Sequence, residues 1–197
     1  MSSILPDYRT LVQDGDMVLC RVNAPLVSEA FKFLRRGIKA TILGRDVAAG
    51  LAATVKKLCK PDEPEHVSIA SFLLKLEAWL DEETQREQRK PNPSESKLIA
   101  LTDRHDCLAC FAEEAPTAAE VIAKIESVFT DNRDSPGIRL ASIHKSKGLE
   151  ARRVFLLEPD GATVPHPLAK SKWQKEQEQH LRYVAITRAI EELTYVS

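Results

Sequence analysis

A polar segment that contains one glycine lies between two apolar runs in the last third of the chain. It reads Ser142-Ile-His-Lys-Ser-Lys-Gly-Leu-Glu150, and the apolar runs are 138–141 and 154–157. Hydroxyl, imidazole and ammonium donors gather here, and Gly148 lets the backbone approach a ligand without a clashing Cβ. A turn of this kind, placed where a buried strand ends, favours binding of an anion such as a phosphate group. Composition alone leaves an ordinary solvated basic turn as an equally good interpretation.

A single arginine near the C-terminus has an unusual place in the helical pattern. Residues 174–189 predict a helix in which the apolar Leu181 and Ala185 share one face with Arg188. Because an unpaired arginine is expensive to bury, two interpretations remain. The guanidinium either pairs with a carboxylate of its own domain or reaches into a cleft, where it stabilises charge on a transferring phosphoryl group.

The elements that must position these segments alternate between strands and helices. Asn23 is expected to cap a helix that Gly37 ends, and a second helix is expected from Val47 to Leu58. Short apolar runs predict strands at 17–20, 40–43, 138–141, 154–157 and 193–196. This alternation predicts an α/β fold with a parallel sheet.

The middle of the chain has helical periodicity throughout. Apolar residues recur at helical spacing from about Ser68 to Asp131, with a charged stretch and a Pro-Asn-Pro loop near residues 81–94. Helices are expected around 96–101, 108–111 and 118–129, and a surface loop at 158–167. We therefore predict three parts: residues 1–62 begin a sheet-containing domain, residues 63–134 form an all-helical insertion, and residues 135–197 complete the domain.

The composition limits the classes of function. The chain has 28 basic and 29 acidic residues among 197, so its net charge of −1 excludes coating of nucleic acid by charge alone. No apolar run approaches the roughly 20 residues that cross a bilayer, so no membrane partner is expected. Cys107 and Cys110 have metal-ligand spacing without a second pair, which favours buried thiols over a metal site. Free thiols and the lack of a signal peptide predict a cytoplasmic protein.

Three segments resemble signature motifs of a known family. His144-Lys-Ser-Lys-Gly-Leu-Glu150 resembles motif V of the UvrD/PcrA/Rep-like superfamily 1 DNA helicases, and Tyr183-Val-Ala-Ile-Thr-Arg-Ala189 resembles their motif VI. Leu19-Cys-Arg-Val-Asn-Ala24 is similar to the Arg-x-Asn segment that follows motif IV. The resemblance covers residues 15–58 and 138–196. It is weak between them, where the family carries a variable insertion domain.

The resemblance implies the C-terminal, second RecA-like motor domain of such a helicase. The expected fold is a RecA-like parallel sheet flanked by helices and interrupted by the helical insertion. In the full-length protein it implies an ATP-dependent DNA helicase, an ATP hydrolase that moves 3′ to 5′ along single-stranded DNA and unwinds duplex junctions. Recognition of backbone and stacked bases makes such a motor largely indifferent to sequence.

Residue roles are carried over by the same resemblance. Arg188 would be the catalytic arginine finger, and with Gly148 and Glu150 it would form this chain's part of the nucleotide site. Four residues would face the backbone of the single strand: Arg21, Asn23, Ser142 and His144. Ala151 stands where the family usually has an aromatic residue, which leaves the local packing there open.

The chain has no Gly-x-x-x-x-Gly-Lys-Ser/Thr phosphate loop and no acidic magnesium motif after one. ATP and Mg²⁺ are therefore expected to bind mainly to the N-terminal RecA-like domain of the same protein, and the isolated chain is expected to be inactive. The alternative is a stand-alone, catalytically inactive helicase-like module that binds DNA or a protein. A helicase–nuclease of the RecB group is a third, weaker interpretation.

Overall fold

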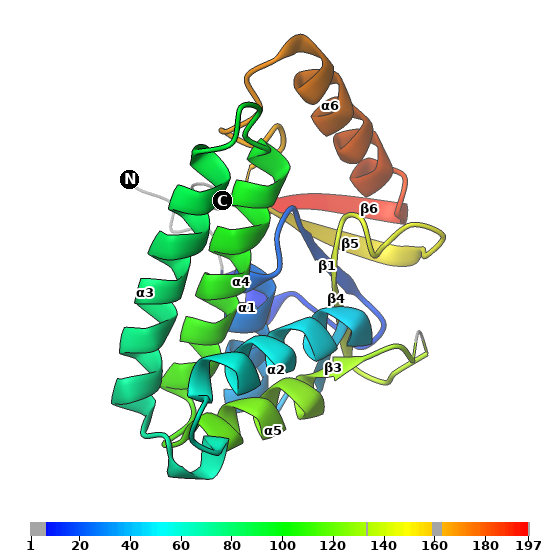
Figure 1. Ribbon diagram of the computed structural model, residues 1–197. Helices are drawn as coiled ribbons and strands as arrows, with labels where there is room; N and C mark the ends of the chain where they lie inside the picture. The colour runs from blue at the N-terminus through cyan, green and yellow to red at the C-terminus, as the bar shows by residue number, and fades with distance from the viewer. Residues whose placement is uncertain (1–6, 133, 159–162, 197) are drawn as a thin grey trace, which may run out of the picture.

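A parallel sheet forms the centre of the molecule (Figure 1). The computed structural model describes residues 7–132, 134–158 and 163–196. Within these residues, six strands form one sheet in the order β3-β2-β4-β1-β5-β6, and every neighbouring pair is parallel. The strands are β1 (Met17–Cys20), β2 (Ala40–Leu43), β3 (Phe129–Thr130), β4 (Ile138–Ser142), β5 (Ala151–Leu157) and β6 (Ala189–Val196). The predicted α/β class and RecA-like arrangement are confirmed.

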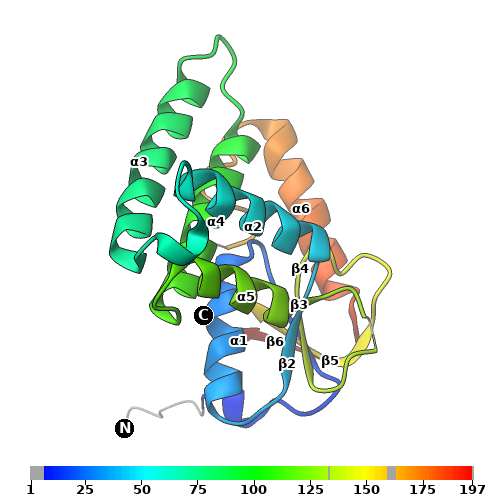
Figure 2. The ribbon, with the colours of Figure 1, turned by 60° about the horizontal axis from the view of Figure 1, so that its bottom comes forward.

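The helices of the described residues cover both faces of this sheet. They are α1 (Ala24–Arg35), α2 (Arg45–Cys59), α3 (Ile69–Gln88), α4 (Glu95–Glu113), α5 (Ala118–Val128) and α6 (Lys172–Ile186), with short 3₁₀ turns η1 (Tyr8–Thr10) and η2 (Pro64–His66). The long helices α3 and α4 lie along each other (Figures 1 and 2). None of the described helices is long and apolar enough to cross a membrane.

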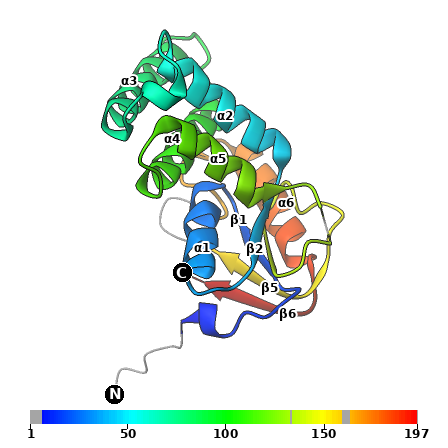
Figure 3. The ribbon, with the colours of Figure 1, turned by 90° about the horizontal axis from the view of Figure 1, so that it is seen from below.

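Strand alternation assigns the helices to the two faces. Val18 and Cys20 of β1 belong to the hydrophobic cluster that contains α1 to α5, whereas Met17 and Leu19 belong to the cluster that contains α6. Successive side chains of a strand point to opposite faces, so one strand serves both clusters. The group α2 to α5 lies together, with α3 farthest from the strands (Figure 3). Helix α6 thus packs on the opposite face of the sheet from α1 to α5.

The helical middle of the chain shares one core with the sheet. Phe111 of α4 packs against Phe31 of α1 with ring centroids 5.3 Å apart, and against Phe129 of β3 at 6.3 Å. Strand β3, which the periodicity did not predict, comes from this middle part and pairs with β2. The proposed boundaries at residues 62 and 134 describe chain order and stay a prediction.

Two helices differ from the prediction. Helix α4 is continuous over Glu95–Glu113, where two shorter helices were expected. Helix α6 ends at Ile186, so Arg188 is not on a helical face, and that prediction was wrong. The physical reason is strand pairing: the N–H of Ala151 donates to the carbonyl of Arg188 at 3.0 Å, and β6 begins at the next residue.

Candidate functional site

The segment between β4 and β5 runs from the edge of the sheet where the strands end, the carboxyl edge, to the edge where they begin, the amino edge. Because the strands are parallel, it leaves the carboxyl end of β4 and must reach the amino end of β5 within eight residues, 143–150. Ser142 and His144 therefore lie at the carboxyl edge, where strand ends usually bind ligands. Gly148 and Glu150 lie at the opposite, amino edge. The candidate residues form two groups rather than one.

Arg188 lies in the turn between α6 and β6, at the amino edge. Its guanidinium donates to three oxygens: Nη1 to the carbonyl of Leu149 at 2.8 Å, Nε to the carbonyl of Val184 at 3.0 Å, and Nη2 to Thr187 Oγ1 at 2.9 Å. In the described part of the chain, no carboxylate pairs with it. Neutral acceptors orient this cation and leave its charge uncompensated, so the interpretation as an ion pair within the domain does not hold there.

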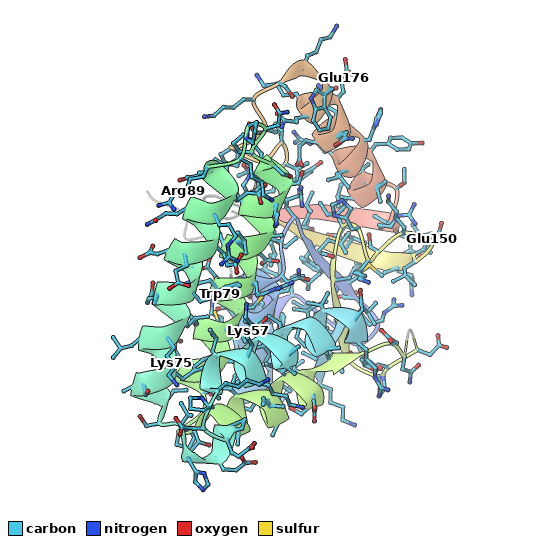
Figure 4. The ribbon with its side chains drawn as sticks, in the orientation of Figure 1. Lys57, Lys75, Trp79, Arg89, Glu150 and Glu176 are labelled. Carbon is cyan, nitrogen blue, oxygen red and sulfur yellow. The ribbon has the colours of Figure 1, made fainter. Side chains whose placement is uncertain are left out.

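The surroundings of Arg188 are open. Leu149, whose carbonyl it contacts, stands between Gly148 and Glu150, and both of these are exposed. Gly148 has a φ of +77°, a conformation that side chains with a Cβ rarely adopt. Glu150 lies just before β5, close to the end of α6 (Figure 4). The three residues predicted to meet a nucleotide are thus neighbours on one exposed edge.

A cavity of about 560 Å³ opens at the carboxyl edge. Its walls come from the ends of β1 and β4, from α4 and from α6, and such a volume is typical of a ligand site. All four residues predicted to face single-stranded DNA line it: Arg21, Asn23, Ser142 and His144. Residues more than a hundred positions apart in the sequence are therefore brought together.

Two of these four residues are engaged by carboxylates. Arg21 donates Nε and Nη2 to Glu178 of α6 at 2.8 to 3.1 Å. Asn23 donates its backbone N–H and Nδ2 to Asp103 of α4 at 2.7 and 2.8 Å. Asp103 also accepts the N–H of Ala24, so it caps α1, and the predicted capping by the Asn23 side chain was wrong.

Burial and nearby charges shift the pKa values of two groups that line the cavity, His144 and Asp103. The pKa of His144 is lowered, first because the cavity walls remove water from the ring, then because Arg21 and Lys147 are positive. The pKa of Asp103 is raised by its burial, although the donors from Asn23 and Ala24 oppose that shift. The lowered pKa favours the neutral form of His144, whose ring offers both a donor and an acceptor.

The sequence-based prediction missed the two carboxylates. Glu178, Leu181 and Ala185 are the buried residues of α6 and have helical spacing, so an acidic residue on an apolar stripe was the available signal. Asp103 gave no such signal, because its partner lies 80 residues away.

The cysteine pair belongs to the core side of α4. Cys107 is buried, with Sγ 3.9 Å from Asp103 Oδ1, and burial raises its pKa well above the usual value. Within the described residues, no three His, Cys, Asp or Glu side chains converge as metal ligands.

Comparison with known proteins points to one family. The model of the UvrD-like helicase C-terminal domain matches residues 64–197. The ATP-dependent DNA helicase PcrA of Staphylococcus epidermidis is 28% identical over 139 residues, which are 69% of this chain and 16% of that protein. PcrA of Staphylococcus aureus is 33% identical over 84 residues, 41% of this chain and 11% of the relative. The ATP-dependent DNA helicase Rep of Salmonella typhimurium is 38% identical over 58 residues, 29% of this chain and 9% of Rep. The chain spans only a small part of the length of these relatives.

Proposed function

Because the chain belongs to the family of UvrD-like helicase C-terminal domains, we propose that it is the second motor domain of an ATP-dependent DNA helicase. The observation that carries the proposal is the guanidinium of Arg188, which neutral acceptors orient on an exposed edge. A fixed cation of this kind is what an arginine finger requires: permanent charge, planar donors and rigid support.

At the amino edge, the domain supplies one wall of the ATP site. Arg188 stabilises negative charge on the phosphoryl group, Glu150 meets the ribose, and Gly148 shapes the wall. The phosphate loop and the ligands for Mg²⁺ belong to the first motor domain, which covers this edge. Tyr183 and Ile190 support such a covered surface, since both flank Arg188 in sequence and are 69% and 62% exposed.

At the carboxyl edge, the domain supplies part of the single-strand track. Ser142 and His144 offer a hydroxyl and a neutral imidazole to the DNA backbone, and Lys147 adds a cation to the same cavity. The Nε–Nη2 edge of Arg21 is occupied by Glu178. Asn23 is held by Asp103, so it shapes the cavity and contributes less binding energy. Contacts of this kind recognise the backbone and not the bases.

In this arrangement one rigid domain binds ATP at one edge of its sheet and single-stranded DNA at the other, so that domain movements driven by ATP can displace the DNA-binding cavity. Closure of the two motor domains around ATP, and opening after hydrolysis, shift the cavity along the strand. The protein moves 3′ to 5′ along the single-stranded DNA and opens the duplex ahead of it as it advances.

The test uses the full-length protein. Single-stranded DNA should stimulate ATP hydrolysis strongly, and a duplex with a 3′ single-stranded tail should be unwound in preference to one with a 5′ tail. A protein that binds the strand but shows no ATP turnover would instead support the second candidate, a helicase-like binding module without catalysis.

A further inference from the structure

Helix α6 carries a carboxylate on the side that faces the protein interior. The buried residues of the helix are Glu178, Leu181 and Ala185. Leu181 and Ala185 pack in the hydrophobic cluster on this face of the sheet, whereas Glu178 is 6% exposed and contacts polar groups. A charge at such a position is retained only if its partners compensate for the lost water.

Glu178 joins three separate segments of the chain. It accepts Nε and Nη2 of Arg21, which follows β1, at 2.8 to 3.1 Å. Its Oε2 also accepts the backbone N–H of His166, in the loop before α6, at 3.1 Å. The side chain of Arg21 is 13% exposed, so the pair is shielded from bulk water. The middle of α6 is therefore tied to the wall of the carboxyl-edge cavity.

Arg21 presents two different edges of its guanidinium. The Nε–Nη2 edge is occupied by Glu178, and in the described part of the structure Nη1 has no hydrogen-bond partner. Since Arg21 lines the cavity, we expect an anion that enters to contact its guanidinium. A phosphate oxygen at this guanidinium must change the electrostatic balance of the Arg21–Glu178 pair.

The other end of α6 leads directly to Arg188. The helix runs from its first turns, near the labelled Glu176, toward the labelled Glu150 at the start of β5 (Figure 4). Eight residues separate Glu178 from Ile186, a rise of about 12 Å at about 1.5 Å per residue. Arg188 then donates back to Val184 in the last turn and to Leu149. One rigid element thus touches both candidate sites.

From these contacts we infer that Glu178 is a positioning residue that couples the binding of single-stranded DNA at the carboxyl-edge cavity to the orientation of Arg188. Binding of single-stranded DNA at Arg21 weakens the ion pair between Arg21 and Glu178. The resulting shift of α6 reaches the turn after the helix, which orients the guanidinium of Arg188. This inference rests on the proposed function, because it requires a strand at one edge and a nucleotide at the other. Helix α6 is then the element whose position depends on both ligands, the single-stranded DNA and the nucleotide.

The test is Glu178→Gln in the full-length protein, assayed with saturating ATP and saturating oligo-dT. The measured quantity is the ratio of the strand-stimulated kcat to each variant's own strand-free kcat, which differences in strand affinity do not affect. We expect this ratio to fall about tenfold, a typical coupling strength between two sites, with a smaller change in the KM for ATP. Glu178→Asp, which keeps the charge but withdraws it by one methylene, should lower the ratio less.

Asp16→Asn is a matched control. Asp16 is 5% exposed and also accepts Nε and Nη2 of an arginine, Arg153, together with a backbone N–H, that of Gln13. This substitution should reduce thermal stability as Glu178→Gln does and leave the ratio unchanged. An equal fall in the control would reduce Glu178 to a structural role and overturn the inference.

A double-variant cycle tests the route through Arg21. If Glu178 acts through Arg21, then Glu178→Gln should lower the ratio no further in an Arg21→Ala background. An unchanged ratio in Glu178→Gln, or fully additive effects, would overturn the inference alone. Absence of any strand stimulation in the unsubstituted protein would overturn the proposed function, and this inference with it.

Discussion

The surroundings of His144 in the fold favour its neutral form. Partial desolvation in the cavity and the positive charges of Arg21 and Lys147 lower its pKa. An anion bound beside the ring would have the opposite effect, because it stabilises the imidazolium. The protonation of His144 and the binding of a phosphate backbone should therefore favour each other.

From this linkage follows a pH dependence of strand binding. The affinity of the chain for oligo-dT should rise on the order of three- to tenfold as the pH falls from about 7.5 to about 5.5, since protonation of His144 adds a cation to the cavity. Fluorescence anisotropy of a labelled oligonucleotide measures this. The His144→Gln variant should show a much weaker dependence, and an identical dependence in both proteins would exclude His144 from the strand site.

Helix α1 begins at a carboxylate that another helix supplies. Asp103 of α4 accepts the backbone N–H groups of Asn23 and Ala24 and the side-chain amide of Asn23. This contact joins the helical middle of the chain to the end of β1. It holds one wall of the cavity by three hydrogen bonds to a single, partly buried side chain.

Removing this cap should cost stability. Asp103→Ala leaves partly buried donors without an acceptor and should lower the free energy of unfolding by about 1–3 kcal/mol. Asp106→Ala, on the same helix with a side chain that is 51% exposed, should change it by less than about 0.5 kcal/mol. Urea denaturation followed by circular dichroism compares the two, and equal midpoints would show that α1 does not depend on Asp103.

The elements that the sequence predicted well are those with local signals. Strand β1 has the predicted bounds because four apolar residues follow a turn and precede Arg21. The end of α6 was missed because Thr187 and Arg188 are compatible with a helix, and only pairing with β5 pulls the chain into a strand. Likewise, the pairing of Arg21 with Glu178 spans 157 residues and has no local signature. Motif spacing predicted which residues gather, but not the carboxylates that hold them.

At the scale of the whole molecule, the two candidate sites lie at opposite edges of one sheet. The chain has a net charge of −1, and Arg21 at the carboxyl edge is paired with Glu178. Under the proposed function, single-stranded DNA would therefore be held by a few local contacts, and the nucleotide would need a second domain. We therefore expect the isolated chain to bind DNA weakly.

The isolated chain should bind oligo-dT weakly, and its affinity should fall as the salt concentration rises. The slope of log K against log salt should correspond to one or two phosphate contacts, at about 0.7 per contact for a single strand. The same preparation should hydrolyse ATP no faster than background, with or without DNA. Tight binding with a steep slope would show a basic surface outside the cavity. Robust ATP hydrolysis would contradict the proposal that this domain supplies only one wall of the ATP site.

The most direct measurement of the central claim is the turnover of the full-length protein with Arg188→Ala, at saturating ATP and single-stranded DNA. Loss of the charge on the phosphoryl group should lower kcat by about a thousandfold or more, with a much smaller change in KM for ATP. Arg188→Lys keeps the charge but not the planar donors, and it should recover only a small part of the rate. Turnover within a few-fold of the unsubstituted protein would show that Arg188 only closes the turn between α6 and β6, and would contradict its assignment as the arginine finger.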